Sequence, residues 1–161
     1  MKISASHYTS PIGEMLLLAT DVGLSGIFFT GQRYFPETDS EWIWEDARLA
    51  NAKRSLDAYF AGGGRVAMPE LDVHGTPFQQ RVWKELRKIP EGQTCSYGEI
   101  ARRMDAPKAV RAVGAAIGRN PISILVPCHR VLGSKGSLTG YAGGMDRKAW
   151  LLEHEAARVL V

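Results

Sequence analysis

The sequence predicts an α+β protein made of two small domains. A small N-terminal α/β-roll-like domain is expected over residues 1–75, and a mainly helical C-terminal domain with a helix-turn-helix over residues 76–161. Before residue 75 the sequence has β-rich runs and one segment with apolar residues at helical spacing. After residue 75 it has strong signals for the start of helices. The 161 residues suit one compact unit or two small domains, and a hydrophobic content of 45% provides a sizeable core.

The N-terminal half begins with two β-rich runs, 14–20 and 24–29, which Asp21-Val22-Gly23 separates. This pattern predicts a hairpin. Apolar residues at helical spacing then predict a helix: Leu49, Ala52, Leu56 and Phe60. Glycines 62–64 end that helix, and residues 65–71 are a plausible returning strand. No residues in this half form a catalytic set.

The C-terminal half opens on a strong helix start. Thr76 is a suitable N-cap, Pro77 suits the first helical position, and Gln79 completes a capping box. A buried face follows at helical spacing: Phe78, Val82, Leu86 and Ile89. A second capping box over Ser96–Glu99 predicts a short helix to about Met104. With a further helix over 108–118, it forms a candidate helix-turn-helix.

The predicted helix over 108–118 is thin, because small residues dominate it: Ala109, Ala112, Gly114, Ala115, Ala116 and Gly118. Such a helix can pack tightly inside a protein, or it can enter a DNA minor groove about 6 Å wide. Five glycines in segment 133–144 permit close backbone approach to a ligand. Asp146 is expected to cap a last helix.

Charge is distributed unevenly along the chain. Residues 1–75 carry 6 Lys and Arg against 10 Asp and Glu, a net charge of −4, whereas residues 76–161 carry 14 against 7, a net of +7. The basic half indicates either a polyanionic partner such as nucleic acid or a solvated basic face.

The two cysteines, with neither a signal peptide nor an apolar run of membrane-spanning length, predict a reducing, cytoplasmic setting. The four histidines are scattered, and no set of metal ligands is found, so we expect neither a metal nor another cofactor.

Pro127-Cys128-His129-Arg130 follows the apolar run 122–126. Burial normally makes a thiol inert, whereas cationic or proton-accepting neighbours favour the nucleophilic thiolate. The local sequence therefore leaves two interpretations of Cys128 open, a packing residue and a nucleophile.

From about Thr76 to Glu155 the chain resembles the O6-alkylguanine-DNA alkyltransferases. The matching motifs, in order, are Ser96-Tyr97-Gly98-Glu99-Ile100, Arg111-Ala112-Val113-Gly114-Ala115, Arg119-Asn120-Pro121, the cysteine motif and Gly140-Tyr141-Ala142-Gly143-Gly144. The resemblance is weaker over residues 1–75.

The resemblance implies a direct-reversal repair reaction in which Cys128 accepts the alkyl group from O6-alkylguanine, and also from O4-alkylthymine, once per molecule. His129 would be the base, acting through a water and oriented by Glu155. Tyr97 would assist base flipping and donate a proton to the departing guanine. The implied partner is double-stranded DNA, bound by a monomer.

The resemblance also implies a DNA-binding helix and a base pocket. Arg111 would fill the vacated base stack, and the same helix presents Ala112, Gly114 and Ala115 to the minor groove. Asn120 would tie the helix-turn-helix to the cysteine loop. The pocket would be lined by Val131, Tyr141 and Ala142, with the carbonyls of Cys128 and Val131 accepting from the guanine amine.

Two alternatives stay open. A non-catalytic module that binds alkylated bases has the same fold, but relatives of that kind lack the cysteine. A cysteine hydrolase would turn over, which a thioether does not allow. One departure concerns Ser123, which stands where several family members carry a second proline, so the rim of the site is expected to be more flexible or roomier.

Overall fold

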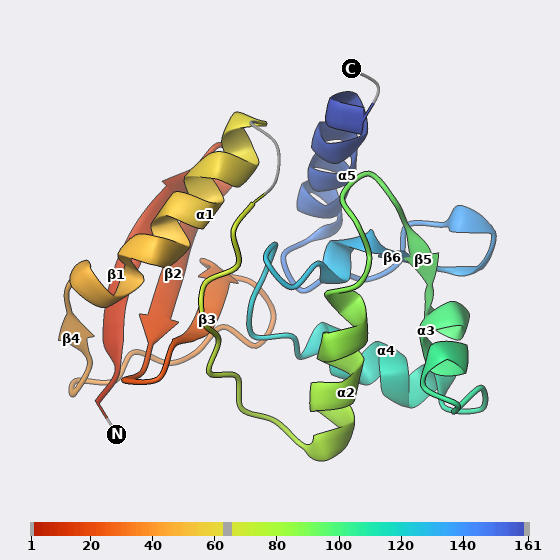
Figure 1. Ribbon diagram of the computed structural model, residues 1–161, viewed down its shortest axis with the longest axis horizontal. Coiled ribbons are helices and arrows are strands. Elements are labelled where there is room, and N and C mark those ends of the chain that lie inside the picture. The colour runs from red at the N-terminus through yellow and green to blue at the C-terminus, as the bar shows by residue number, and fades with distance from the viewer. Residues whose placement is uncertain (1, 63–65, 160–161) are drawn as a thin grey trace. The chain divides into compact units, whose positions relative to one another are not determined.

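The computed structural model describes residues 2–62 and 66–159 (Figure 1). It divides the chain into two compact units. The first contains Met1–His74 and Pro121–Leu125, and the second contains Gly75–Asn120 and Val126–Val161. The short segment 121–125, which the sequence placed with the C-terminal half, pairs with the sheet of the first unit. Ile27 donates its N–H to the carbonyl of Pro121 at 2.8 Å, and Ser123 donates to Ile27 at 3.1 Å.

The first unit contains a four-stranded sheet in the order β3-β2-β1-β4. Its strands are β1 (Ser4–Ser10), β2 (Gly13–Ala19), β3 (Leu24–Phe29) and β4 (Ile43–Trp44). Strands β2 and β3 pair antiparallel, which confirms the predicted hairpin. Strand β1 pairs antiparallel with β2, and the short β4 is parallel to β1. Strand β1 was not predicted, because its sequence, SASHYTS, has mostly small and polar residues even where it is buried.

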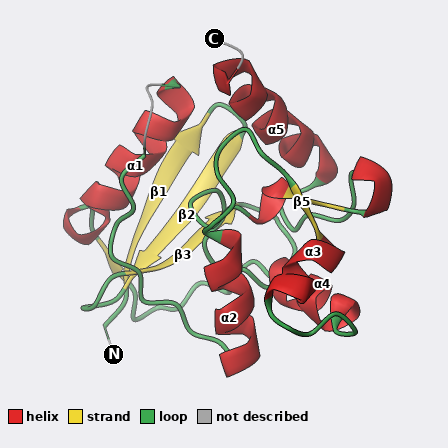
Figure 2. Cartoon of the chain, turned by 45° about the vertical axis from the view of Figure 1, so that its right-hand side comes forward, coloured by secondary structure: helices red, strands yellow, loops and turns green. Residues whose placement is uncertain are grey.

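Helix α1 (Ala50–Ala61) follows the 3-10 turn η1 (Ala47–Leu49) and lies along the sheet (Figure 2). Its buried residues include Leu56, as the helical spacing predicted. Gly62 ends the helix in the left-handed conformation, with φ 73°, which glycine adopts without a Cβ clash. Gly63 and Gly64 of the predicted stop lie outside the described residues.

The returning strand predicted over 65–71 is wrong for the part that the structure describes. Residues 66–70 are not a strand, and only Leu71 forms an isolated parallel bridge, to Leu24. Pro69 has no N–H to donate to a ladder, which disfavours a continuous strand here. Arg65 lies outside the described residues.

The second unit begins with helix α2 (Pro77–Leu86), and its capping box forms as predicted. Gln79 donates its backbone N–H to the Thr76 hydroxyl at 3.1 Å, and Thr76 donates its own to the Gln79 side chain at 3.0 Å. Trp83, on the buried face, donates its indole N–H to the carbonyl of Ala116 at 2.8 Å, which ties α2 to a later helix.

That later helix is α4 (Val110–Gly118), and α3 (Tyr97–Arg103) precedes it, so the predicted helix pair is present. Helix α4 begins two residues later than predicted. The predicted second capping box is only half formed. Ser96 accepts from the backbone N–H of Glu99 at 3.0 Å, but the Glu99 carboxylate binds Arg102 and Arg103 instead of reaching back.

The chain then forms η2 (Cys128–Arg130), η3 (Ser134–Gly136) and α5 (Met145–Val159). Two short strands, β5 (Cys95–Ser96) and β6 (Val131–Leu132), pair in parallel.

Asp146 is not the cap of α5, contrary to prediction. It lies in the first turn, and Gly144, with φ 97°, directly precedes the helix. Glycine adopts this positive φ without a Cβ penalty, so it suits the residue before the helix better than aspartate. No described helix is both long and apolar enough to cross a membrane.

Candidate functional site

A tight turn leads into the cysteine. The N–H of Cys128 donates to the carbonyl of Val126 at 2.8 Å across Pro127, whose φ and ψ are −82° and 65°. These angles define an inverse γ-turn. Asn120 supports the turn from the end of α4, because its side-chain amide donates to the same Val126 carbonyl at 2.8 Å.

The Cys128 side chain is buried, with 7% of the residue exposed. Burial raises the pKa of the thiol above its ordinary value, while a hydrogen bond from Asn120 and the charge of Lys148 oppose the rise. Before any reaction, the Cys128 side chain is therefore a protonated thiol at neutral pH. Its reactivity requires a base close by.

His129 and Arg130 converge on one carboxylate from α5. Glu155 accepts from His129 Nε2 at 2.5 Å and from Arg130 Nε at 2.7 Å. Arg130 also donates to the carbonyl of Ile89 at 2.7 Å. Burial by itself raises the pKa of Glu155, but these hydrogen bonds and charges outweigh it and lower the value to about 2. Glu155 is thus a carboxylate at neutral pH.

His129 is neutral in this setting. Burial lowers its pKa, and this effect exceeds the opposing influence of Glu155. A neutral imidazole that faces a carboxylate through Nε2 carries its proton there, which leaves Nδ1 as an acceptor. Nδ1 is buried and has no hydrogen-bond partner among the described residues. The ring that follows Cys128 in the sequence therefore holds a lone pair that can accept a proton.

Lys148 is fully buried on α5, with 0% of the residue exposed. Its ammonium donates to the carbonyls of Val131 at 2.6 Å and Thr139 at 2.8 Å. Thr139 in turn donates its hydroxyl to the Tyr97 phenol oxygen at 3.1 Å. Burial lowers the pKa of Lys148, and the negative charge of a Cys128 thiolate raises it. These contacts connect Tyr97, at the start of α3, with Val131 beside the cysteine turn.

Of the pocket residues expected in the glycine-rich segment, Tyr141 lies near His129. The rings of Tyr141 and His129 meet edge to face, with centroids 6.4 Å apart and planes at 77°. Tyr141 and Ala142 are half-buried, and Val131 is fully buried.

The four residues expected to meet DNA share helix α4. Arg111, Ala112 and Ala115 are exposed, and Gly114 is half-buried. A Cβ placed on Gly114 would lie 3.8 Å from the Tyr97 ring, so this glycine lies directly beside that ring. The opposite side of α4 is packed, with Val113 and Ile117 buried. One helix thus has a thin, exposed face and also borders Tyr97.

Two polar residues of the site were not predicted. Arg130 was expected only as a cation near the thiol, and its bond to Glu155 was not predicted. The apolar run before Arg130 could have indicated this contact. Such a run suggests that the arginine is buried, and a buried arginine requires an acidic partner. Lys148 gave no signal, since Asp146-Arg147-Lys148 has the composition of a solvated helix face.

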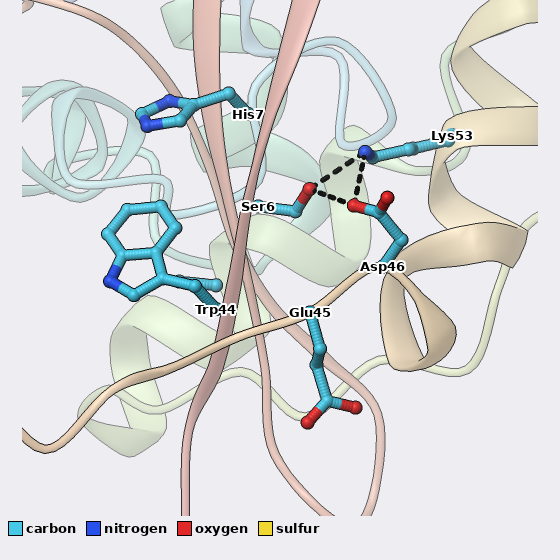
Figure 3. A pocket seen from close by; sticks show the side chains of 7 residues that line it. Ser6, His7, Trp44, Glu45, Asp46 and Lys53 are labelled. Atoms are coloured by element: carbon cyan, nitrogen blue, oxygen red, sulfur yellow. Dashed lines mark hydrogen bonds and ion pairs between the residues drawn. The ribbon is translucent and has the colours of Figure 1, made fainter.

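The first unit contains a separate shallow pocket (Figure 3). Ser6 and Lys53 both bind Asp46 there, at 2.5 and 2.9 Å, and Lys53 also donates to Ser6 at 2.7 Å. Trp44 stacks on His7 with ring centroids 5.0 Å apart. The central polar groups therefore satisfy one another, and none of the predicted site residues lines this pocket.

Among the described residues, no group of three or more His, Cys, Asp or Glu side chains could hold a metal ion. The expectation that no metal is required stays a prediction. The site around Cys128 consists of a buried thiol, a neutral imidazole and a carboxylate. These are the three kinds of group that an activated cysteine nucleophile requires.

Comparison with known proteins specifies the class. Residues 3–71 match the ribonuclease-like domain of 6-O-methylguanine DNA methyltransferase, and residues 77–157 match the DNA-binding domain of the same family. The chain belongs to the 6-O-methylguanine DNA methyltransferase family.

Curated relatives and solved structures agree. A methylated-DNA–protein-cysteine methyltransferase of Mycobacterium leprae is 50% identical, with 94% of this chain and 91% of the relative covered. One from Methanosarcina acetivorans is 45% identical, with coverages of 93% and 96%. A crystal structure of Mycobacterium tuberculosis OGT in complex with DNA has a TM-score of 0.89 and 46% identity, with coverages of 96% and 94%.

Proposed function

We propose that this protein repairs double-stranded DNA by moving the alkyl group of O6-alkylguanine, and of O4-alkylthymine, to the Cys128 sulfur. The observation that carries the proposal is a buried thiol followed in the sequence by His129, a neutral imidazole that a carboxylate orients. A sulfur nucleophile suits attack on saturated carbon, and the family of the chain supports this reaction. We place the protein in the cytoplasm and expect it to act as a monomer.

The reaction begins with the loss of the thiol proton. His129 accepts it at Nδ1 through a water, and Glu155 stabilises the resulting imidazolium. The Cys128 thiolate attacks the alkyl carbon, the carbon–O6 bond breaks, and its electron pair passes to guanine. Tyr97 donates a proton to the departing base, and His129 returns one to Tyr97 through solvent. The thioether that forms has no route back to a thiol, so each molecule reacts once.

The substrate must leave the base stack to reach a buried sulfur. Arg111, exposed on α4, fills the space left in the duplex, while Ala112, Gly114 and Ala115 let the helix approach the minor groove. Val131, Tyr141 and Ala142 line the pocket for the flipped base. The carbonyls of Cys128 and Val131 accept from its exocyclic amine. Asn120 keeps the cysteine turn in place.

Intact-protein mass spectrometry tests the proposal. After incubation with excess O6-methylguanine duplex, we expect a gain of one methyl group and about one repaired lesion per protein molecule. Sustained repair of many lesions would instead support a hydrolase. Binding without any mass gain would support the non-catalytic module.

Replacing Arg111 with alanine should separate base flipping from chemistry. We expect transfer from duplex DNA to slow by about 10-fold or more, because flipping costs a few kcal/mol and Arg111 offsets part of it. Reaction with free O6-benzylguanine, where the wild type accepts it, should change by less than about threefold. Lys108→Ala, which also removes an exposed cation, is the matched control. Equal losses on both substrates would assign Arg111 to the fold or the pocket.

Binding to undamaged duplexes should depend on salt but little on sequence. The half with net charge +7 supplies phosphate contacts, and each adds about −0.9 to the slope of log affinity against log salt. The small side chains of α4 can read little of the degenerate minor-groove pattern. Fluorescence anisotropy on several duplexes measures both effects. A flat salt response, or a strong preference for one sequence, would contradict this interpretation of α4.

A further inference from the structure

A fully buried lysine is unusual, and Lys148 has no carboxylate partner among the described residues. Its ammonium is held by two backbone carbonyls instead, those of Val131 and Thr139. Removing a charge from water is costly, and two neutral acceptors offset that cost less well than a carboxylate does. A contribution to the stability of the fold therefore does not by itself explain why a charged lysine occupies this buried position.

The two carbonyls come from two different segments that carry proposed site residues. Val131 directly follows the turn that carries Cys128 and His129, whereas Thr139 lies in the glycine-rich segment. Thr139 contacts Lys148 through its carbonyl and Tyr97 through its hydroxyl. One ammonium therefore links a carbonyl expected to recognise guanine with the residue that orients the proposed proton donor.

We infer that Lys148 is a positioning residue for base recognition, which fixes the Val131 carbonyl for the guanine amine and, through Thr139, the Tyr97 phenol. This inference rests on the proposed function. A carbonyl oxygen has two lone pairs. Lys148 takes one at Val131, which holds the carbonyl in place, and the second remains for the exocyclic amine of the base.

A positioning role of Lys148 can be distinguished from a purely electrostatic effect on the thiol. Lys148 also lowers the pKa of Cys128 by its charge, so its removal would slow any reaction of the thiol. A positioning role adds a dependence on the structure of the base. The two roles therefore separate when the reacting alkyl group is kept and the base is changed.

The experiment uses the full chain and varies both the protein and the base of the substrate. Transfer rates are measured for the wild type and Lys148→Met on two duplexes, one with O6-methylguanine and one with O6-methylhypoxanthine, which lacks the exocyclic amine. We expect the wild type to react about 10-fold more slowly without the amine, the effect of one hydrogen bond. In Lys148→Met that ratio should fall below about threefold. Arg147→Met, on the same helix, should retain the wild-type ratio.

Alkylation of Cys128 by iodoacetamide provides the second readout, because this reagent requires no base recognition. Lys148→Met should lose more rate on O6-methylguanine than on iodoacetamide. Equal losses on both, or an unchanged amine ratio, would overturn the inference in favour of a charge effect. A wild type without an amine preference would also overturn it. A wild type that takes no methyl group from either duplex would refute the proposed function itself.

Thr139→Val gives an independent test, and it applies even when Lys148→Met does not fold. Valine keeps the backbone carbonyl for Lys148 and removes the hydroxyl that reaches Tyr97. We expect slower transfer from O6-methylguanine, and no further loss when Thr139→Val is added to Tyr97→Phe. Additive losses would show that Thr139 does not act through the phenol and would overturn that part of the inference.

Discussion

Replacement of Cys128 by serine is expected to abolish alkyl transfer, with a loss of about 10³-fold or more, whereas Cys95→Ser should retain it. A serine hydroxyl ionises far less readily than a thiol and is a weak nucleophile towards saturated carbon. Cys95 is the matched control because it is the only other cysteine in the sequence. Its thiol contacts the carbonyl of Ser96 at 3.6 Å, and burial raises its pKa.

The measurement is the protein mass after reaction with O6-methylguanine duplex, followed by peptide mapping of the modified residue. Both variants should show the wild-type unfolding transition, so that lost transfer reports chemistry. A methyl group on Cys95, or full transfer by Cys128→Ser, would remove Cys128 from the acceptor role.

Glu155→Gln is expected to destabilise the protein by about 3–5 kcal/mol at neutral pH, because it leaves a buried guanidinium without its carboxylate. It should also slow transfer, since an amide cannot hold the His129 tautomer or stabilise the imidazolium as an anion does. Urea unfolding and single-turnover transfer rates measure the two effects. Glu153→Gln is the control, because it is an exposed glutamate on the same helix.

The same carboxylate gives the wild type a defined acid sensitivity. The pKa of Glu155 is lowered from its ordinary 4.5 to about 2 in the folded protein. The unfolded chain therefore takes up a proton first as the pH falls. The associated stability, about 3 kcal/mol, is fully present above pH 4.5 and is lost progressively down to about pH 2. Glu155→Gln should flatten this part of the stability profile, and an unchanged profile would contradict the assignment.

The sequence predicts the local structures best where one short motif is sufficient. The capping box at Thr76 and the hairpin over β2 and β3 formed as expected. The predictions failed where contacts with residues outside the motif determine the structure. Glu99 has the spacing of a capping residue, but Arg102 and Arg103 compete for its carboxylate. Strand β1 is stabilised by its neighbours in the sheet and not by its own composition.

The candidate site shows the same division. The resemblance placed Cys128, His129 and Glu155 in one site, and the structure brings His129 and Glu155 into contact. The environment of Lys148 could not be predicted, because its two acceptors are backbone carbonyls. Main-chain carbonyls occur at every residue, so no pattern of side chains marks them. Only the fold determines which of them converge on one ammonium.

The pairing of segment 121–125 with Ile27 has a practical consequence for dividing this protein into fragments. A fragment that starts near residue 75 would retain Cys128, His129, Glu155 and Lys148 but would lose the sheet partner of Ile122. The sequence Ile122-Ser123-Ile124-Leu125-Val126 would then become an unpaired apolar strand, the kind of segment that promotes aggregation. Attempts to produce the acceptor region alone should therefore give insoluble protein unless the N-terminal unit is co-expressed.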